Sequence, residues 1–289
     1  MTQTVGVIGL GNMGRGICKN IAKSGHDVLV WDVSEAACDA QTSIAKITPP
    51  QQMAAQANLI IFVVPGSEQI DEILDPILKK GGDDLILWDF TTSDPIYTKK
   101  LAQRAEAAGM PYMDAGMTGG GAKGADEGTM TLMIGGDFDI LERSRSVLEA
   151  CAEKLIHLGP SGAGHTMKVV HNLITHTNFL ACSEAGRLAE AAGIELADMI
   201  KVFNAGNARS FISERRFPDH ILSETWDGRS RIFNLHKDVG MAVALSKELG
   251  SPMRLGHQTL AWIQAAMDAD MQDEDFTRLY PALDKLTDS

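Results

Sequence analysis

The sequence is short of positive charge and has no long apolar run. Its 289 residues carry 26 Lys and Arg against 38 Asp and Glu, so the formal net charge is -12. A nucleic-acid surface needs basic side chains to neutralise phosphates, so this balance argues against a nucleic-acid partner. The longest purely apolar run near the start, residues 59–64, is far too short to cross a bilayer, which argues against a membrane protein.

The cysteines show neither a redox nor a metal-binding pattern. None forms a CxxC pair or has metal-like spacing with histidine, so we expect reduced thiols and no bound metal. The N-terminus has no basic segment followed by a long apolar one, as a signal peptide would. We therefore expect a cytoplasmic protein. The cysteines are Cys18, Cys38, Cys151 and Cys182.

The first half of the chain alternates short apolar runs with segments of helical length. This alternation predicts an α/β domain of Rossmann type, with a parallel sheet covered on both faces. After about residue 162 only Ala- and Leu-rich helical segments follow, so we place a dinucleotide-binding domain at 1–162 and an all-helical domain at 163–289. LGPSGAG, residues 158–164, is the natural hinge. Strands are expected at 4–10, 28–32, 59–64, 84–89, 111–113 and 130–134, and helices at 12–24, 67–80, 95–108, 163–192, 195–206, 234–250 and 253–270.

The first expected strand runs into a glycine-rich turn that is typical of nucleotide-binding proteins. In such a turn Gly9 allows the tight bend, Gly11 lets the backbone approach a pyrophosphate, and Gly14 permits close packing of helix on strand. The N-terminus of the following helix presents N–H donors to the phosphates. The alternative is an ordinary glycine turn. That interpretation does not explain why the turn stands between a strand and a helix and is followed by an acidic residue, Asp32, at the end of the second strand. The turn consists of Gly9, Leu10, Gly11, Asn12, Met13 and Gly14.

Asp32 indicates which dinucleotide is preferred. It ends the second strand, 21 residues after Gly11, near the spacing of the acid that holds the adenosine ribose. Its carboxylate can accept hydrogen bonds from ribose hydroxyls but would repel a 2′-phosphate. Glu35 adds negative charge, and no Arg or Lys lies between Asp32 and Lys46. We therefore expect NAD rather than NADP.

Residues 114–128, DAGMTGGGAKGADEG, hold six glycines directly after a strand. A flexible connector is one interpretation, and composition alone favours it. The alternative is a loop whose backbone N–H groups bind a substrate anion.

The stretch GAGHTMKVVHNLITH, residues 162–176, places three polar side chains on an otherwise apolar helix. Lys168, His171 and Asn172 stand at positions i, i+3 and i+4, so they leave neighbouring parts of one helix surface. A lysine can act as general acid/base only if its pKa falls below the ordinary value of about 10.4, as burial or a nearby positive charge would cause. The alternatives are a surface lysine and a structural histidine.

Five motifs, in order, resemble those of the β-hydroxyacid dehydrogenases, the family of 3-hydroxyisobutyrate dehydrogenase and tartronate semialdehyde reductase. The resemblance covers almost the whole chain. The motifs are Gly9 to Gly14, Asp89 to Pro95 (DFTTSDP), Asp114 to Gly120, Gly162 to Asn172, and Lys237-Asp238.

The resemblance implies an NAD(P)-dependent oxidoreductase that acts on the CH–OH group of a small anionic hydroxyacid. Lys168 is then the general acid/base, with Asn172 as its catalytic partner. Lys237 closes over the site from the helical domain and contacts both substrate and cofactor. The helical domains of such proteins pair into homodimers or homotetramers. Further cofactor-binding positions are Asn12, Met13, Val64, Pro65 and Thr92, and further substrate-binding positions are Thr118, Gly119, Gly120 and His171.

Several positions depart from the family pattern. Gly116 and Met117 replace Pro and Val, Thr118 replaces Ser, and His171 replaces the first Asn, changes that lean toward 6-phosphogluconate dehydrogenase. That relative carries an acid seven positions after the lysine, where this chain has Thr175, so decarboxylation is not expected.

Two further readings on this architecture are an imine reductase and a non-catalytic binding module. Both generally lack the lysine, so Lys168 disfavours them. Arg209, Arg215 and Arg216 would either sense a second substrate anion or form surface ion pairs, which we favour. The particular hydroxyacid is left open.

Overall fold

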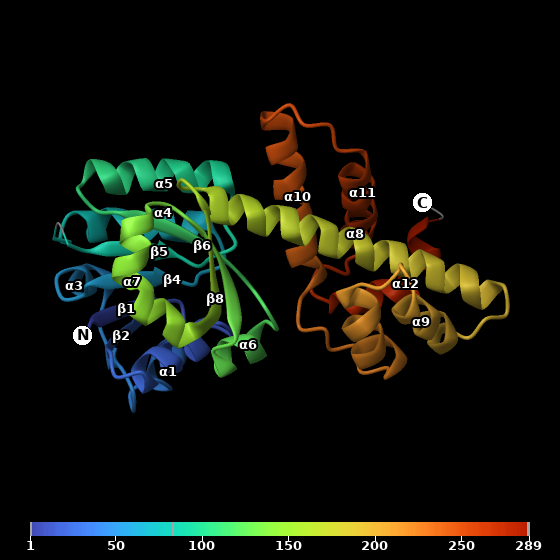
Figure 1. The fold of residues 1–289 in the computed structure, drawn as a ribbon, viewed down its shortest axis with the longest axis horizontal. Helices are drawn as coiled ribbons and strands as arrows, with labels where there is room; N and C mark the ends of the chain where they lie inside the picture. Colours follow the sequence, from blue (N-terminus) through green and yellow to red (C-terminus); the bar gives the residue numbers. More distant parts are fainter. Residues whose placement is uncertain (1, 83, 288–289) are drawn as a thin grey trace. The chain divides into compact units, whose positions relative to one another are not determined.

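The computed structural model describes residues 2–82 and 84–287, and it divides into two compact units, Met1–Lys168 and Val169–Ser289. The first unit is an α/β domain and the second contains helices, which confirms the expected fold class (Figure 1). The division falls within one long helix, α8 (Ala163–Ala191), so its first turns belong to the α/β unit.

The first unit is built on one sheet with the order β3-β2-β1-β4-β5-β6-β7-β8. From β3 to β6 every neighbouring pair is parallel. The chain leaves β1 toward β2 on one side and returns to β4 on the other, so the strand order reverses beside β1, where α/β proteins bind nucleotides. The strands are β1 (Thr4–Ile8), β2 (Asp27–Trp31), β3 (Lys46–Ile47), β4 (Leu59–Phe62), β5 (Ile86–Asp89), β6 (Tyr112–Thr118), β7 (Met130–Gly135) and β8 (Ala152–Gly159).

Apolar side chains on both faces of the strands explain why helices cover both faces of the sheet. Neighbouring residues of β4 point to opposite faces, so Ile61 packs into one core cluster and Ile60 into the other. The first cluster includes side chains of α1 and α7, and the second includes side chains of α3, α4 and α5. The helices are α1 (Gly14–Lys23), α2 (Glu35–Asp39), α3 (Pro50–Ala54), α4 (Ser67–Leu78), α5 (Pro95–Ala107), α6 (Ala122–Glu127) and α7 (Phe138–Cys151).

One strand pair departs from the expected parallel sheet. β7 runs antiparallel to β6, with Met117 opposite Leu132. Only residues 119–129 join these strands, and they include just the short helix α6. A parallel return needs a crossover of a dozen or more residues, so this connection favours a reversal of direction.

The second unit packs its helices around a core of aromatic and aliphatic side chains. Phe179 of α8 lies 4.9 Å from Phe276, ring centre to ring centre, and Phe217 lies 5.5 Å from Tyr280, both pairs edge to face. Trp226 and neighbouring apolar residues complete this core. Besides α8, the elements are α9 (Leu196–Ala205), the π-helix Ile212–Leu222, α10 (Ile232–Glu248), α11 (Arg254–Asp268), the 3₁₀ turn Phe276–Arg278 and α12 (Leu279–Thr287).

Sequence patterns located the long elements but missed several short or polar ones. The strand at 152–159 was not expected, because exposed and buried positions in it do not alternate regularly. The helix at 138–151 was also missed, although Asp137 caps it by accepting hydrogen bonds from the backbone N–H groups of Asp139 and Ile140. None of the described helices has the length and apolar character that crossing a membrane requires.

Candidate active site

The glycine-rich turn after β1 has the geometry that a dinucleotide requires. Gly9 adopts φ +97°, and a Cβ there would overlap Val63 O, so the bend excludes other residues. A Cβ on Gly14 would overlap Gly9 O, which shows how closely α1 approaches β1. By contrast, a Cβ on Gly11 would meet no atom within 4 Å, so the backbone there faces open space. These three environments fit a pyrophosphate lying over Gly11 at the start of α1.

Asp32 is joined to this turn by hydrogen bonds. The backbone N–H of Leu10 donates to Asp32 Oδ2 at 2.6 Å, and that of Ser34 donates to Oδ1 at 2.8 Å. Each carboxylate oxygen can accept more than one hydrogen bond, so capacity remains for ribose hydroxyls. The carboxylate is thus held next to the Gly-rich turn, where the adenosine side of a dinucleotide would lie.

The other expected cofactor positions follow neighbouring parallel strands. Val64 and Pro65 follow β4 by two and three residues, and Thr92 follows β5 by three. The N–H of Val64 donates to the Thr91 hydroxyl at 3.2 Å, which links the two segments. Carboxyl ends of parallel strands meet at one edge of a sheet, so these residues share an edge with the Gly-rich turn and with Thr118, the last residue of β6.

Lys168 lies against the end of β6. A Cβ built on the buried Gly116 would be 2.5 Å from Lys168 Cβ and 3.1 Å from Gly164 O. Gly116 therefore leaves the space that the lysine occupies, two residues before Thr118. The structure brings Lys168 to the part of the sheet where sequence analysis placed the substrate.

A buried carboxylate fixes the start of α8. Asp114, with no exposed surface, accepts hydrogen bonds from the N–H of Gly162 at 2.6 Å and of His165 at 2.8 Å. These are donors that a helix N-terminus leaves without intrahelical partners, and the negative charge favours the positive end of the helix dipole. Asp114 thus couples β6 to the helix that carries Lys168.

A second buried group supports the same turn. The His165 ring has no exposed surface; its Nε2 lies 3.1 Å from Asp89 O and its Nδ1 lies 2.8 Å from Thr98 Oγ1. A carbonyl oxygen can only accept, so Nε2 carries a proton. The Asp89 carboxylate accepts hydrogen bonds from the N–H of Thr91, the Ser93 hydroxyl and the Tyr112 hydroxyl. Burial raises the pKa of Asp89, whereas nearby His165 and these donors oppose that rise.

The loop after β6 turns through three glycines with positive φ. Gly119, Gly120 and Gly121 have φ values of +103°, +96° and +58°. Residues with a Cβ rarely adopt these values, so this sequence keeps an unusual backbone course directly after Thr118. Such a course is compatible with backbone N–H groups facing an anion.

In the second unit, polar side chains gather around Asp238. The amide of Asn172, 8% exposed, donates from Nδ2 to Asp238 Oδ2 at 2.6 Å. Asn172 Oδ1 lies 3.1 Å from His171 Nδ1. Lys237 Nζ lies 3.7 Å from Asp238 Oδ1, and His176 Nε2 lies 3.8 Å from Asp238 Oδ2. Asp238 thus contacts both Lys237 and Asn172.

Family models match both halves of the chain. Residues 4–159 match the NAD-binding domain of 6-phosphogluconate dehydrogenase, and residues 162–283 match the model described as the NAD-binding part of NADP-dependent 3-hydroxyisobutyrate dehydrogenase. The probable mitochondrial 3-hydroxyisobutyrate dehydrogenase of Dictyostelium discoideum is 30% identical over 298 residues, covering 98% of this chain and 92% of the relative. The chain belongs to the β-hydroxyacid dehydrogenase family. It is therefore an NAD(P)-dependent oxidoreductase of hydroxyacid CH–OH groups.

Solved structures agree with this membership. The Mycobacterium tuberculosis 3-hydroxyisobutyrate dehydrogenase with L-serine superimposes with a TM-score of 0.90 at 27% identity, covering 98% of this chain and 99% of that one. An imine reductase from Pseudomonas sp. reaches a TM-score of 0.62 at 19% identity, covering 98% of this chain and 100% of that one, which is a likeness of fold alone.

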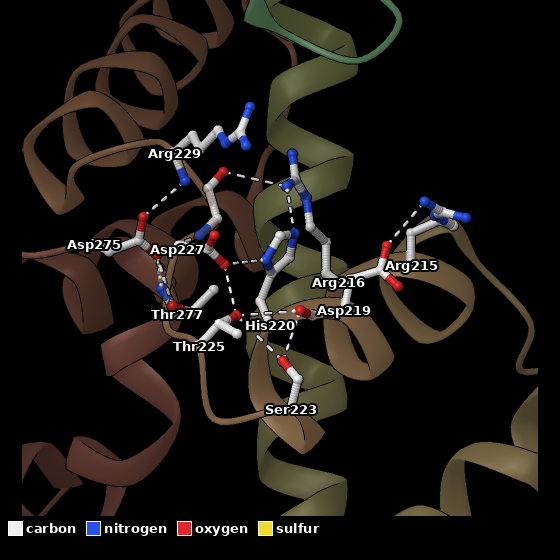
Figure 2. Close-up of polar contacts among 11 residues, drawn as sticks. Arg215, Arg216, Asp219, His220, Ser223, Thr225, Asp227, Arg229, Asp275 and Thr277 are labelled. Atoms are coloured by element: carbon white, nitrogen blue, oxygen red, sulfur yellow. Dashed lines mark hydrogen bonds and ion pairs between the residues drawn. The ribbon is translucent and has the colours of Figure 1, made fainter. Parts of the chain in front are cut away.

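The three arginines for which we expected ion pairs or a substrate anion, Arg209, Arg215 and Arg216, contact neighbouring groups of the second unit. Arg209 Nε lies 2.7 Å from Glu214, and Arg215 Nη2 lies 2.9 Å from Asp219, as the ion-pair interpretation expects. Arg216 Nη1 instead lies 3.3 Å from His220 Nε2 and donates to the carbonyl of Gly228 at 3.2 Å. Figure 2 shows its guanidinium beside His220. Burial lowers the pKa of Arg216.

The groups that hold the site residues in place were not evident from the sequence pattern. These groups include Asp89, Asp114 and Asp238, which stand in the quoted motifs. The hydrogen-bond partners of Asp114 lie 48 or more residues away in the chain, and the partner of Asp238 lies 66 residues away. His165 was quoted without a role, although its position three residues before Lys168 was a usable signal.

Proposed function

We propose that this dehydrogenase interconverts a small β-hydroxycarboxylate and its semialdehyde or ketone, with NAD preferred over NADP and Lys168 as general acid/base. The observation that carries the proposal is the position of Lys168, packed over Gly116 at the end of β6. That strand end lies at the same sheet edge as the Gly-rich turn and Asp32. The proposed proton carrier and the glycine-rich turn that would bind the dinucleotide therefore lie at the same edge of the sheet, within one unit.

Oxidation of the alcohol needs a hydride acceptor and a proton acceptor. Bound NAD supplies the first by taking hydride at its nicotinamide ring. Lys168, as a neutral amine, would take the hydroxyl proton, and in the reverse direction its ammonium would return a proton to the carbonyl oxygen. Asp114 and His165 contribute by holding the first turns of α8, so the amine keeps its position during both transfers.

Substrate binding is proposed for the loop that follows β6 and for residues of the second unit. The backbone N–H groups of Gly119 and Gly120, with the Thr118 hydroxyl, would hold the carboxylate. Asn172 keeps its catalytic assignment, since an amide oxygen that faces His171 can accept a second hydrogen bond. Lys237 is proposed to contact substrate and cofactor, and His171 the substrate.

NAD preference is proposed from Asp32. Its carboxylate is fixed by the N–H groups of Leu10 and Ser34, so it cannot readily turn away from an incoming 2′-phosphate. Repulsion between the two anions would disfavour NADP.

The alternatives of a decarboxylating enzyme, an imine reductase and a binding module each lack support at a particular residue. Thr175 stands where a decarboxylating relative has its acid, and its hydroxyl donates to His171 O at 2.8 Å, a bond within the helix. Retained Lys168 disfavours the other two.

We also propose a cytoplasmic homodimer or homotetramer that takes neither nucleic acid nor membrane as a partner. Large apolar side chains are exposed on the second unit: Leu188 at 73% and Val202 at 70%. Pairing of such surfaces would remove apolar area from water. The four cysteines are buried and form no disulfide, which fits a reducing compartment.

Turnover of the Lys168→Arg variant tests the proton-transfer role. A guanidinium keeps the charge but cannot give up and recover a proton near neutral pH, so kcat should fall roughly 10²- to 10⁴-fold. NAD affinity, measured by titration of the same sample, should be unchanged, and a panel of 3-hydroxyacids should show activity with the unmodified enzyme. Near-normal kcat in the variant would remove Lys168 from proton transfer.

A further inference from the structure

The short helix α6 packs tightly against α1, the helix that begins at the glycine-rich turn. The two helices lie side by side in the first unit (Figure 1). A Cβ on Gly16 of α1 would be 2.7 Å from the carbonyl carbon of Ala125 and 2.8 Å from the backbone nitrogen of Asp126. Gly16 therefore lets the backbones of α1 and α6 approach each other with no side chain between them.

Asn20 adds a polar contact between the same two helices. Its Nδ2 donates to the carbonyl oxygen of Ala125 at 2.7 Å and lies 3.4 Å from the carbonyl oxygen of Asp126. The last carbonyl groups of a helix have no donor within that helix, and α6 is only six residues long. The Asn20 amide thus supplies, from α1, a donor for the carbonyl end of α6.

Ala125 connects this contact to the three-glycine loop, Gly119 to Gly121. Ala125 has no exposed surface, and its N–H donates to Gly121 O at 3.0 Å. Gly124 packs on the same loop, because a Cβ there would overlap Gly119 O. One segment of α6 therefore contacts the three-glycine loop through its N–H side and α1 through its carbonyl side.

We infer that Asn20, acting through the backbone of Ala125, positions the three-glycine loop for the substrate carboxylate. The inference rests on the proposed function, in which the N–H groups of Gly119 and Gly120 hold that carboxylate. All three glycines have positive φ, and glycine can adopt many other conformations. A contact from outside the loop restricts it to one conformation before the substrate arrives, which reduces the entropy lost on binding.

Hydrogen exchange tests this anchor without any substrate. Mass spectrometry follows the backbone amides of a peptide covering residues 119–131 in the unmodified protein and in Asn20→Asp. The variant keeps the size of the side chain, but a carboxylate oxygen then faces the Ala125 carbonyl and the donor is lost. We expect exchange in this peptide to become about tenfold faster. Unchanged exchange would overturn the inference.

Two further variants separate the lost donor from the added charge. Asn58→Asp is the matched control, because Asn58 lies just before β4 and its Oδ1 accepts from the N–H of Thr4 at 2.9 Å, a bond that a carboxylate keeps. Exchange in residues 119–131 should not change there. Asn20→Leu removes the donor without adding charge and should behave like Asn20→Asp. Faster exchange in Asn20→Asp alone would assign the effect to charge and overturn the role of the hydrogen bond.

Steady-state kinetics test the consequence for the substrate. The probe is whichever of 3-hydroxyisobutyrate, glycerate and threonate gives the highest kcat/KM. The loop would hold the carboxylate equally in the ground state and the transition state, so a less ordered loop should raise KM and leave kcat nearly unchanged. We expect KM to rise about tenfold in both Asn20 variants, with NAD affinity unchanged and Asn58→Asp like the unmodified enzyme. An unchanged KM, or a loss confined to kcat, would overturn the positioning role.

The variant Gly120→Val distinguishes failure of this inference from failure of the proposed function. It obstructs the three-glycine loop directly, so KM should rise if the loop holds the carboxylate. A raised KM in folded Gly120→Val with an unchanged KM in the Asn20 variants would overturn this inference alone. An unchanged KM in Gly120→Val would count against the proposed function, and the exchange measurement would still decide whether Asn20 anchors the loop.

Discussion

Replacing Gly116 by alanine should displace Lys168 without disturbing the glycine-rich turn that would bind the cofactor. The backbone of Gly116 has no left-handed conformation, so the added methyl group acts through contact rather than through backbone strain. That methyl carbon would lie 2.5 Å from Lys168 Cβ and 3.1 Å from Gly164 O. Both neighbours belong to α8, so either the lysine or the first turns of the helix must move.

The size of the movement follows from these distances. Carbon atoms reach favourable contact at about 3.5–4.0 Å, so Lys168 Cβ must retreat by about 1 Å or slightly more. A displacement of that size at a reacting group can cost about 10²-fold in turnover. Overpacking of this kind also destabilises a fold by about 1–3 kcal/mol.

The assay compares kcat, NAD affinity and the unfolding midpoint of Gly116→Ala with those of Gly240→Ala. Gly240 lies in α10, where a Cβ would meet no atom within 4 Å, so the same substitution there should leave turnover unchanged and stabilise the helix slightly. We expect Gly116→Ala to lose about 10²-fold in kcat while binding NAD normally. Turnover within about twofold of the unmodified enzyme would refute the idea that this contact positions Lys168.

Three carboxylates carry the remaining predictions. Asp32→Ala should narrow a preference for NAD over NADP that we expect to exceed about tenfold in kcat/KM; a preference for NADP in the unmodified enzyme would contradict the role of Asp32. Asp114→Asn should cost roughly 1.5–3 kcal/mol in urea unfolding, because one of its two acceptor oxygens becomes a donor facing an N–H group, and an unchanged midpoint would be evidence against the cap. Hydrogen bonds from Tyr97 and Arg104 lower the pKa of Asp71. This carboxylate therefore stabilises the fold at neutral pH, and the contribution is lost as pH falls below the ordinary aspartate pKa and through the lowered one. Melting curves of Asp71→Asn should therefore lie closest to those of the unmodified protein in acid, and a constant difference at every pH would exclude the linkage.

Local sequence patterns were sufficient to predict the fold class and the glycine-rich turn that is expected to bind the dinucleotide. Both depend on local patterns: apolar runs at strand length, and a turn in which Gly9 bends and Gly14 admits the helix. Such features are decided by the sterics of a few consecutive residues, so their spacing in the chain is sufficient evidence. The helical spacing of Lys168, His171 and Asn172 is local in the same sense.

The surroundings of these residues, by contrast, depend on how distant segments of the chain fold together. The antiparallel pairing of β7, the cap that Asp114 places on α8 and the contact of Asp238 with Asn172 all join segments that are distant in the chain. The reversal at β7 reflects a short connection whose geometry a glycine-rich composition does not reveal. The two carboxylates stand in recognisable motifs, yet nothing in the sequence states which donors reach them. A hydrogen bond depends on distance and direction in the folded chain, and a steric contact depends on which segments meet there. The space that Gly116 leaves for Lys168 therefore also came from the structure.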